Sequence, residues 1–250
     1  MKVRDFIAIS FAAVLLCMGP SPLLAGEHDE RAIEVLKAWN NYQATLNAVV
    51  IRGTSLQDAR LGAGLIVSNS EEITVSLKKP ASLHLKQFDG VNTMEIFFHN
   101  GQLTTFDSGL GYYAQADVPK DLGAALDFSL EEMGVDAPLM DLVRANVFDQ
   151  LAEIADSILY LSDQSLVAGA YCHQIAIRGT DLDVQLWIQK GEIPVPRRIM
   201  ITNKWEGGAP RFVAEMDWTT AAKIDDSEFV FKAPEGARQI EFMTSLDRRK

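Results

Sequence analysis

Histidine and cysteine are the residues of this sequence that could serve as metal ligands, general bases or nucleophiles. The four histidines are His28, His84, His99 and His173, and no two of them stand four residues apart, as zinc ligands on one helix face would. Cys172 directly precedes His173, but neighbouring side chains of a strand point to opposite faces and cannot form a nucleophile and base pair. We therefore expect no catalytic residue and no metal site.

Motifs of the common enzyme classes are also missing from the sequence. It contains no Gly-x-Ser-x-Gly elbow, no glycine-rich phosphate loop and no dinucleotide fingerprint. Adjacent acidic residues stand where predicted elements end, and solvated carboxylates or caps of helices and turns explain them: Glu71-Glu72, Glu131-Glu132 and Asp225-Asp226. The residues thus indicate a protein that is not an enzyme and needs no cofactor.

Composition and charge narrow the class of protein further. The chain has 34 acidic and 23 basic residues, a formal charge of −11, which disfavours binding to nucleic-acid phosphates and to anionic lipid head groups. A hydrophobic fraction of 48% is too high for a disordered chain, and 250 residues suit one large β-rich domain. Two cysteines exclude a disulfide framework.

Residues 1–25 have the pattern of a secretory signal peptide. Two basic residues precede an apolar run from Phe6 to Met18, and a proline-containing break leads to Ala25. The run is shorter than the ~20 residues that a bilayer span needs. We expect cleavage after Ala25 and a periplasmic mature protein, residues 26–250, without stable insertion in a membrane.

Hydrophobic spacing predicts one helix followed by strands in the first half of the mature chain. Helical spacing comes first, because apolar residues recur every three or four positions: Ile33, Leu36, Trp39, Tyr42 and Leu46. From Val49 to Phe106 the period is two, and Asn100-Gly101 is a hairpin signal. An antiparallel meander is expected here.

A helical insertion is predicted between residues 119 and 155, because helical spacing returns there in three short segments. The period of two then resumes in six segments: Ile158–Leu161, Tyr171–Ile177, Val184–Ile188, Ile199–Thr202, Phe212–Trp218 and Glu228–Phe231. No Pro-, Gly- or Ser-rich linker divides the chain. The insertion therefore interrupts one sheet and does not form a second domain.

About eleven strands with one apolar face are expected, and a sheet of that width curls. We predict a mainly β protein with helices (α+β), an open antiparallel half-barrel wrapped around the N-terminal helix and the central insertion. The alternative is a closed barrel with the insertion as a plug or lid.

The apolar face of the predicted sheet is large enough to suggest a ligand. A packed core explains most of its residues individually, but a concave sheet covered by short helices can leave a cleft, and methionines suit an adaptable apolar pocket. The candidate cavity residues are Leu85, Ile96, Phe98, Leu126, Leu130, Met133, Met140, Leu186, Ile199 and Trp218.

Several motifs resemble those of the lipoprotein-localisation-factor superfamily, which includes LolA, LolB and RseB-like proteins. These motifs are Lys78-Lys79-Pro80 with Leu83, Asn100-Gly101-x-Leu103, and Asp226-x-x-Phe229-x-Phe231-x-x-Pro234-x-Gly236-Ala237. Over most of residues 30 to 240 the chain more closely resembles a family of predicted periplasmic proteins of unknown function. The residues that carry this likeness are Cys172-His173, Asp183–Ile188, Pro194-x-Pro196-Arg197-Arg198, Ile201-Thr202 and Asp217-Trp218.

The resemblance implies a half-barrel that encloses helices and has a hydrophobic cavity. We expect a non-enzymatic binding protein or carrier for a lipid, a lipidated protein or another apolar ligand. The alternative is an RseB-like sensory or protein-interaction module of the cell envelope, with a structural cavity and an outer face that meets an envelope protein. LolA-type carriers have an arginine where this chain has Lys79, so we do not expect the housekeeping lipoprotein carrier.

Overall fold

The structure is a computed structural model that describes residues 28–135, 139, 142, 144, 146–205 and 207–242. The predicted signal peptide and the candidate Met140 lie outside the described residues. In the described part of the chain, no helix is both long enough and apolar enough to cross a membrane.

Twelve strands form one sheet in the described residues: β1 (Ala48–Arg60), β2 (Ile66–Lys78), β3 (Ser82–Phe88), β4 (Thr93–His99), β5 (Gln102–Asp107), β6 (Tyr112–Asp117), β7 (Ser157–Val167), β8 (Ala170–Arg178), β9 (Leu182–Gln189), β10 (Pro196–Asn203), β11 (Arg211–Thr219) and β12 (Arg238–Ile240). Their order is β12-β6-β5-β4-β3-β2-β1-β11-β10-β9-β8-β7. All neighbours are antiparallel except β12, which runs parallel to β6.

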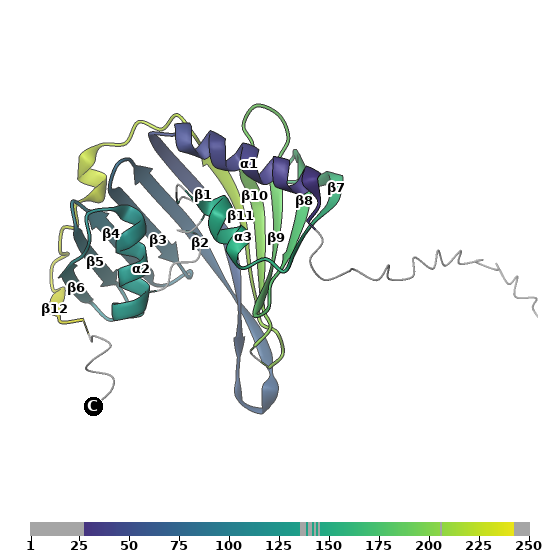
Figure 1. Cartoon of the computed structure of the whole chain (residues 1–250). Helices are drawn as coiled ribbons and strands as arrows, with labels where there is room; N and C mark the ends of the chain where they lie inside the picture. The colour runs from purple at the N-terminus through teal and green to yellow at the C-terminus, as the bar shows by residue number, and fades with distance from the viewer. Residues whose placement is uncertain are drawn as a thin grey trace, which may run out of the picture.

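The sheet is curved and open (Figure 1). Its edge strands β12 and β7 stand at opposite ends of the order and do not pair with each other in the described residues. The predicted open half-barrel is therefore confirmed, and the closed-barrel alternative is wrong.

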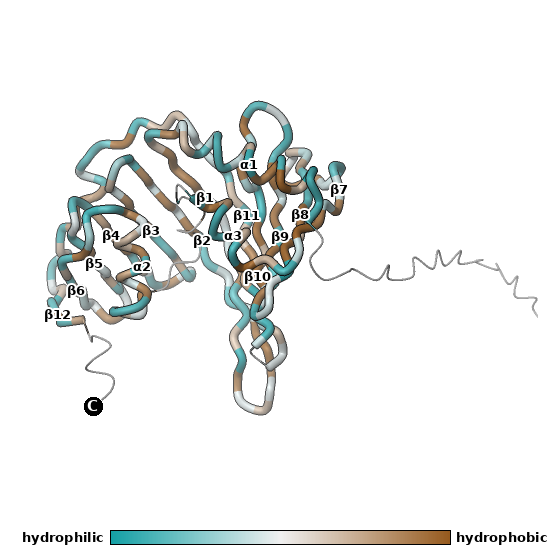
Figure 2. The backbone as a smooth tube through the Cα atoms, in the orientation of Figure 1, coloured by the Kyte–Doolittle hydropathy of each residue, from teal (hydrophilic) through white to brown (hydrophobic). Residues whose placement is uncertain are grey.

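Alternation along the strands places apolar side chains on the concave face. Val75 lies opposite Leu85, and Leu85 lies opposite Ile96 on the next strand, so the same face is apolar across three strands. On the other half of the sheet, Leu186 lies opposite Ile199. Figure 2 shows these hydrophobic stretches alternating with hydrophilic ones along the strands. The resulting core spans both halves of the sheet.

Helices cover the concave face, as Figure 1 shows. They are α1 (Glu30–Thr45), α2 (Leu122–Phe128), its π-helical continuation η2 (Ser129–Met133), and α3 (Val147–Glu153). Asp29 caps the N-terminus of α1, because its carboxylate accepts a hydrogen bond from the Arg31 N–H at 2.8 Å. In Figure 1, α1 and α3 lie over the β8–β11 half of the sheet and α2 lies over the β3–β5 half.

The C-terminal segment covers the convex face of β3 to β6. The strand predicted at Glu228–Phe231 is wrong, because residues Asp226–Phe229 form a 3-10 helix, η4, capped by the Asp225 carboxylate. The apolar alternation of this segment arises because Phe229 and Phe231 pack onto convex-face aromatic side chains. The chain's last strand is β12, which pairs with β6 and which the hydrophobic spacing does not predict.

The hairpin of β1 and β2 projects beyond the body of the sheet (Figure 1). These two strands stay paired as far as Arg60 and Ile66, whereas the pairing of β1 with β11 ends at Gln57. Three further residues of β1 therefore extend past β11, a projection of about 10 Å before the turn. We call residues 57–69, together with the adjoining β10–β11 loop at 203–205 and 207–211, the finger.

Candidate functional site

A mostly apolar hollow of about 410 Å³ lies between the central helices and the concave face. Leu130 of η2 lies on one side of it, and Val147 and Leu151 of α3 lie on another. Ile199 and Ile201 of β10 form part of its floor. Its walls therefore come from the helical insertion and from the second half of the sheet.

Local periodicity explains why these side chains converge. Ile199 and Ile201 are two residues apart on one strand, so both face the concave side. Val147 and Leu151 are four residues apart on α3, so they lie on one face of that helix. The short helix α3 covers part of the strands and leaves the hollow beside it.

A second, more polar hollow of about 560 Å³ adjoins the first, and both are bounded by Asp127, Arg144 and Gln150. The Arg144 side chain is almost completely buried, and its Nη1 lies 2.7 Å from the Asp127 carboxylate. Because a buried guanidinium is costly without a partner, this ion pair holds the boundary between the two hollows. Gln43 of α1 donates a hydrogen bond to the Arg144 carbonyl at 2.7 Å and fixes this segment to α1.

Lys79 lies at the rim of the polar hollow and binds the end of α1. Its Nζ donates to the carbonyl oxygens of Gln43 and Ala44, each at 3.1 Å. Burial lowers the pKa of Lys79, while the carbonyl groups at a helix C-terminus favour a cation there. The basic residue before Pro80 therefore secures α1 to the sheet.

The predicted cavity residues occupy three different environments. Leu130 and Ile199 line the apolar hollow, whereas Leu126 and Met133 are partly buried against the core. Leu85, Ile96, Phe98 and Leu186 are buried within the packed core of the concave face. Trp218 is partly buried, and its Nε1 donates to the Pro196 carbonyl at 2.7 Å.

Some residues of the hollow were not among the candidates: Leu142, Arg144, Val147, Leu151 and Ile201. For Val147 and Leu151 a sequence signal exists, because their four-residue spacing within a predicted helix places both side chains on one helix face. No sequence signal connects Arg144 with Asp127, because their contact depends on how the insertion folds back on itself.

The largest of the three hollows, about 640 Å³, is polar and lies at the outer ends of β2 to β5. The Asp89 carboxylate there accepts hydrogen bonds from the backbone N–H groups of Val91 and Asn92, which lower its pKa. This arrangement is a capped surface turn. The smaller apolar hollow on the concave face is therefore the better candidate for a binding site.

Cys172 and His173 lie in different surroundings. Cys172 is buried with Val167 and Trp187, and this burial raises the pKa of its thiol. The His173 ring has its Nδ1 2.6 Å from the hydroxyl of Tyr160, which packs against the main core. Among the described residues there is no cluster of three or more metal-ligating side chains.

Residues 32–243 match the family described as "Predicted periplasmic protein (DUF2092)". The chain belongs to this family. The expected membership in a family of periplasmic proteins is thus confirmed, and the protein is periplasmic. No curated protein sequence matches the chain of this DUF2092 protein significantly.

The DUF2092 chain is similar to solved structures at low identity. One is in the Pseudomonas aeruginosa MucA/MucB complex, with 18% identity over 81% of this chain and 62% of that chain and a TM-score of 0.46. Another is the Mycobacterium tuberculosis lipoprotein LppX, with 11% identity over 79% and 100% and a TM-score of 0.46. A third is a LolA superfamily protein of Nitrosomonas europaea, with 10% identity over 80% and 97% and a TM-score of 0.38. This chain spans 62% of the length of its match in the MucA/MucB complex.

Proposed function

We propose that this protein is a non-enzymatic periplasmic binding protein or carrier for a lipid or another ligand with an acyl chain, held in the apolar hollow. One observation carries the proposal: the 410 Å³ hollow that β10, η2 and α3 line mainly with aliphatic side chains. Its volume is in the range of small-molecule pockets, roughly 300–1,000 Å³.

The adjoining polar hollow could bind the polar group of a ligand whose hydrocarbon chain lies in the apolar hollow. Arg144 and Lys79 bring positive charge to its lining, and Asp121 and Asp127 bring negative charge. An amphipathic molecule can therefore put its hydrocarbon chain against Ile199 and Leu130 and its polar group beside the ion pair. This arrangement favours a single-chain lipid over a wholly apolar compound.

Leu130→Glu tests the proposal, because this residue lines the hollow yet keeps 52% of its surface exposed, so the change does not disturb the core. A carboxylate at the wall of the hollow opposes burial of the ligand's nearest methylene groups, and burial of each such group contributes roughly 0.8 kcal/mol to the binding free energy. Losing two such groups predicts about tenfold weaker binding of a fluorescent fatty acid, measured by titration.

Leu161→Glu is the matched control, because Leu161 is a leucine with 50% exposure on β7, away from the hollow. It should bind the fatty acid as the unaltered protein does. Equal affinities of all three proteins would contradict the proposed site.

Native mass spectrometry of protein purified from the periplasm addresses the natural ligand. A carrier should retain an adduct with the mass of a lipid. The same spectrum reports the mass of the chain, and we propose that residues 1–25 have been removed as a signal peptide and that residues 26–250 form one domain.

The alternative, a protein-interaction module of the envelope, has one specific observation in its favour. The edge strand β7 exposes Leu161 and Leu166, the start of β8 exposes Tyr171, and the ladder between β7 and β8 is irregular. An edge of this kind can pair with an added strand. A protein that carries no lipid adduct and binds no fatty acid would favour this second function.

A further inference from the structure

The finger exposes large hydrophobic side chains where the chain extends farthest from the body. Leu61 and Leu65 flank its tip with 51% and 59% of their surfaces exposed, and Trp205 in the adjoining loop is 70% exposed. Only the small residues Gly62, Ala63 and Gly64 separate the two leucines. The tip therefore presents leucine side chains without a polar cover.

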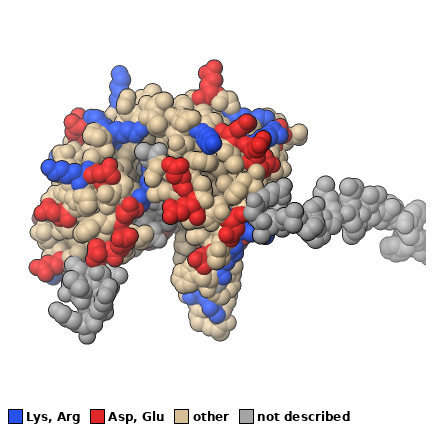
Figure 3. All heavy atoms as spheres, in the orientation of Figure 1, with Lys and Arg blue, Asp and Glu red and all other residues tan. Residues whose placement is uncertain are grey.

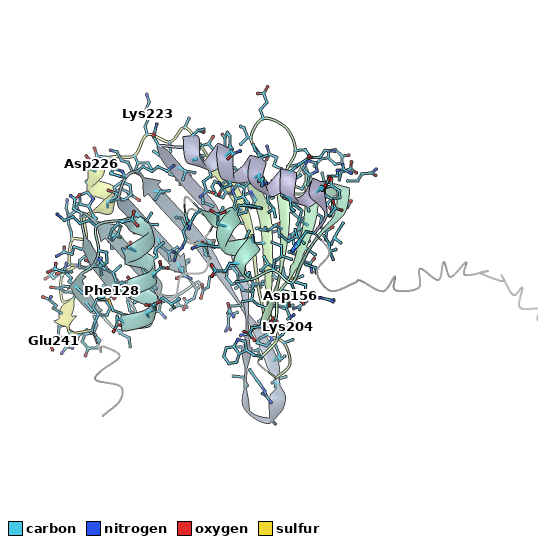
Figure 4. All side chains as sticks on the ribbon, viewed as in Figure 1. Phe128, Asp156, Lys204, Lys223, Asp226 and Glu241 are labelled. Carbon is cyan, nitrogen blue, oxygen red and sulfur yellow. The ribbon has the colours of Figure 1, made fainter. Side chains whose placement is uncertain are left out.

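The backbone holds these side chains in a defined arrangement. The Leu61 N–H donates to the Leu65 carbonyl at 2.7 Å, which closes the turn. The β10–β11 loop packs against the hairpin so closely that a Cβ at Gly207 would meet Arg60, and a Cβ at Gly208 would meet Ile66 at 2.7 Å. The hairpin and the loop are thus one unit, and Lys204 stands in that loop (Figure 4).

Charge on the finger differs from charge on the rest of the molecule. Among its described residues the finger has three basic side chains, Arg60, Lys204 and Arg211, and one acidic side chain, Asp58, whereas the whole chain has a net charge of −11; Glu206 lies outside the described residues. Asp58 contacts Arg211 and accepts a hydrogen bond from Ser68, and Lys204 forms an ion pair with Asp183 of β9 at 2.9 Å. Figure 3 shows tan and blue at the lower end of the finger, while red side chains gather on the body.

Distance separates Leu65 at the tip from the acidic residues farther along β2. Along β2, the first acidic residue after the tip is Glu71, five residues beyond Ile66, a separation of about 17 Å. This exceeds the Debye length of about 10 Å at 0.1 M salt, so the body's negative charge is largely screened at the tip. The overall acidity therefore does not keep the finger from a membrane surface.

We propose that the finger docks reversibly on the surface of a phospholipid bilayer, with Leu61 and Leu65 among the acyl chains and Trp205 near the head groups. Leucine favours the hydrocarbon region, and tryptophan favours the membrane–water interface. A protein partner fits less well, because a stable protein interface buries roughly 800 Å² on each side, more than a turn of this size offers.

The position of the finger relative to the apolar hollow supports a bilayer as the occupant. Ile201 lines that hollow, and β10 continues from it to Asn203 and into the loop that carries Trp205. Four residues of extended chain span about 13 Å. A docked finger therefore brings the hollow close to the lipid surface. The inference that docking serves the hollow rests on the proposed lipid-binding function, whereas the inference that the finger docks on a bilayer does not.

Co-sedimentation with vesicles of phosphatidylcholine and phosphatidylglycerol tests the proposal. The purified protein should bind the vesicles, and Leu61→Ser/Leu65→Ser should weaken binding about tenfold, because two aliphatic side chains no longer leave water. Both side chains are exposed, so circular dichroism should show an unchanged fold. The control Leu110→Ser removes a leucine with 68% exposure from the β5–β6 turn and should bind as the unaltered protein does.

Tryptophan fluorescence locates the contact. Trp39 is fully buried, Trp187 nearly so, and Trp218 partly buried with its Nε1 bonded to the Pro196 carbonyl, whereas Trp205 is exposed. Vesicles should therefore shift the emission to shorter wavelength, and Trp205→Phe should abolish the shift. Any one of three results would overturn the proposal: no binding by the unaltered protein, equal binding of the double variant, or equal loss in Leu110→Ser. Dimerisation in solution that Leu61→Ser/Leu65→Ser abolishes would show that a second copy, not a bilayer, covers the tip.

Discussion

His84 connects three parts of the convex face through a single imidazole ring. Its Nε2 lies 2.8 Å from the Glu95 carboxylate on β4, and its Nδ1 lies 3.2 Å from the Glu228 carboxylate on η4. The ring stacks on Phe97 with 4.1 Å between centroids. A histidine that looked like a candidate for chemistry therefore has a structural role that joins β3, β4 and the C-terminal segment.

Glu95→Gln should make stability less dependent on acid pH. The hydrogen bond with His84 lowers the pKa of Glu95 below its ordinary value, although burial opposes this shift. The carboxylate therefore contributes stability above the pKa of an unfolded glutamate, and this contribution is lost as pH falls through the lower folded value. At pH 7 the variant should be less stable by about 1 kcal/mol in urea unfolding, and at acid pH the difference should shrink.

Glu192→Gln, a change of an exposed carboxylate in the loop before β10, is the control and should alter stability little at either pH. A constant difference between Glu95→Gln and the unaltered protein at all pH values would contradict the assigned role of the hydrogen bond.

Sequence spacing predicts which side chains face the core but not which of them a ligand could reach. Leu186 and Ile199 are opposite each other on neighbouring strands and share the concave face. Leu186 is fully buried, whereas Ile199 lines the apolar hollow. The difference depends on where α3 and η2 lie over the sheet, and this tertiary placement has no local sequence signal.

The C-terminal segment shows how an element can have the period of a strand without being one. Phe229 packs near His99, and Phe231 contacts Phe97, Phe106 and Tyr113 with ring centroids 5.1 to 5.6 Å apart. Lys78 and Asp226 add an ion pair at 2.6 Å. Figure 4 places Asp226 and Glu241 at two ends of this segment, which crosses the convex face of the first half of the sheet.

Regular strands were predictable because they have one buried face and one solvent-exposed face, and β3 and β11 follow this rule. The rule fails where both faces of a strand are covered by other parts of the chain. It also fails where apolar residues alternate in a segment that packs onto the sheet without being one of its strands. Phe97 and Trp187 are apolar on the convex side, and Phe229 alternates with Phe231 because both cover that side. The three-residue strand β12 lacks an apolar period altogether, since its residues are exposed.

Phe229→Ala should reveal how much the C-terminal segment stabilises the sheet. The side chain is buried, so the free energy of unfolding should fall by about 3–5 kcal/mol in urea titration. The neighbouring change Val230→Ala removes an exposed side chain and should alter stability by less than about 0.5 kcal/mol. Similar effects of the two substitutions would mean that the segment does not pack onto the convex face as the structure shows.

At the scale of the whole molecule, two apolar features share strand β10 but differ in exposure. The apolar hollow is bordered on several sides by helices and strands, whereas Leu61 and Leu65 at the finger tip are more than half exposed. In Figure 1 the hairpin that forms most of the finger projects away from the helices that cover the hollow. Because the two features use different side chains, substitutions can alter one without the other.

Transfer of a fluorescent fatty acid from vesicles to the protein should depend on both features. Leu61→Ser/Leu65→Ser should slow transfer about tenfold, by reducing residence on the vesicle, yet leave the affinity for fatty acid in solution unchanged. Leu130→Glu should weaken that affinity and leave vesicle sedimentation unchanged, because Leu130 is not part of the finger. Stopped-flow fluorescence measures the transfer rate and titration measures the affinity. If the double variant also lost affinity for soluble fatty acid, the finger and the hollow would be one site; if it transferred at the normal rate, loading would not require contact with the bilayer.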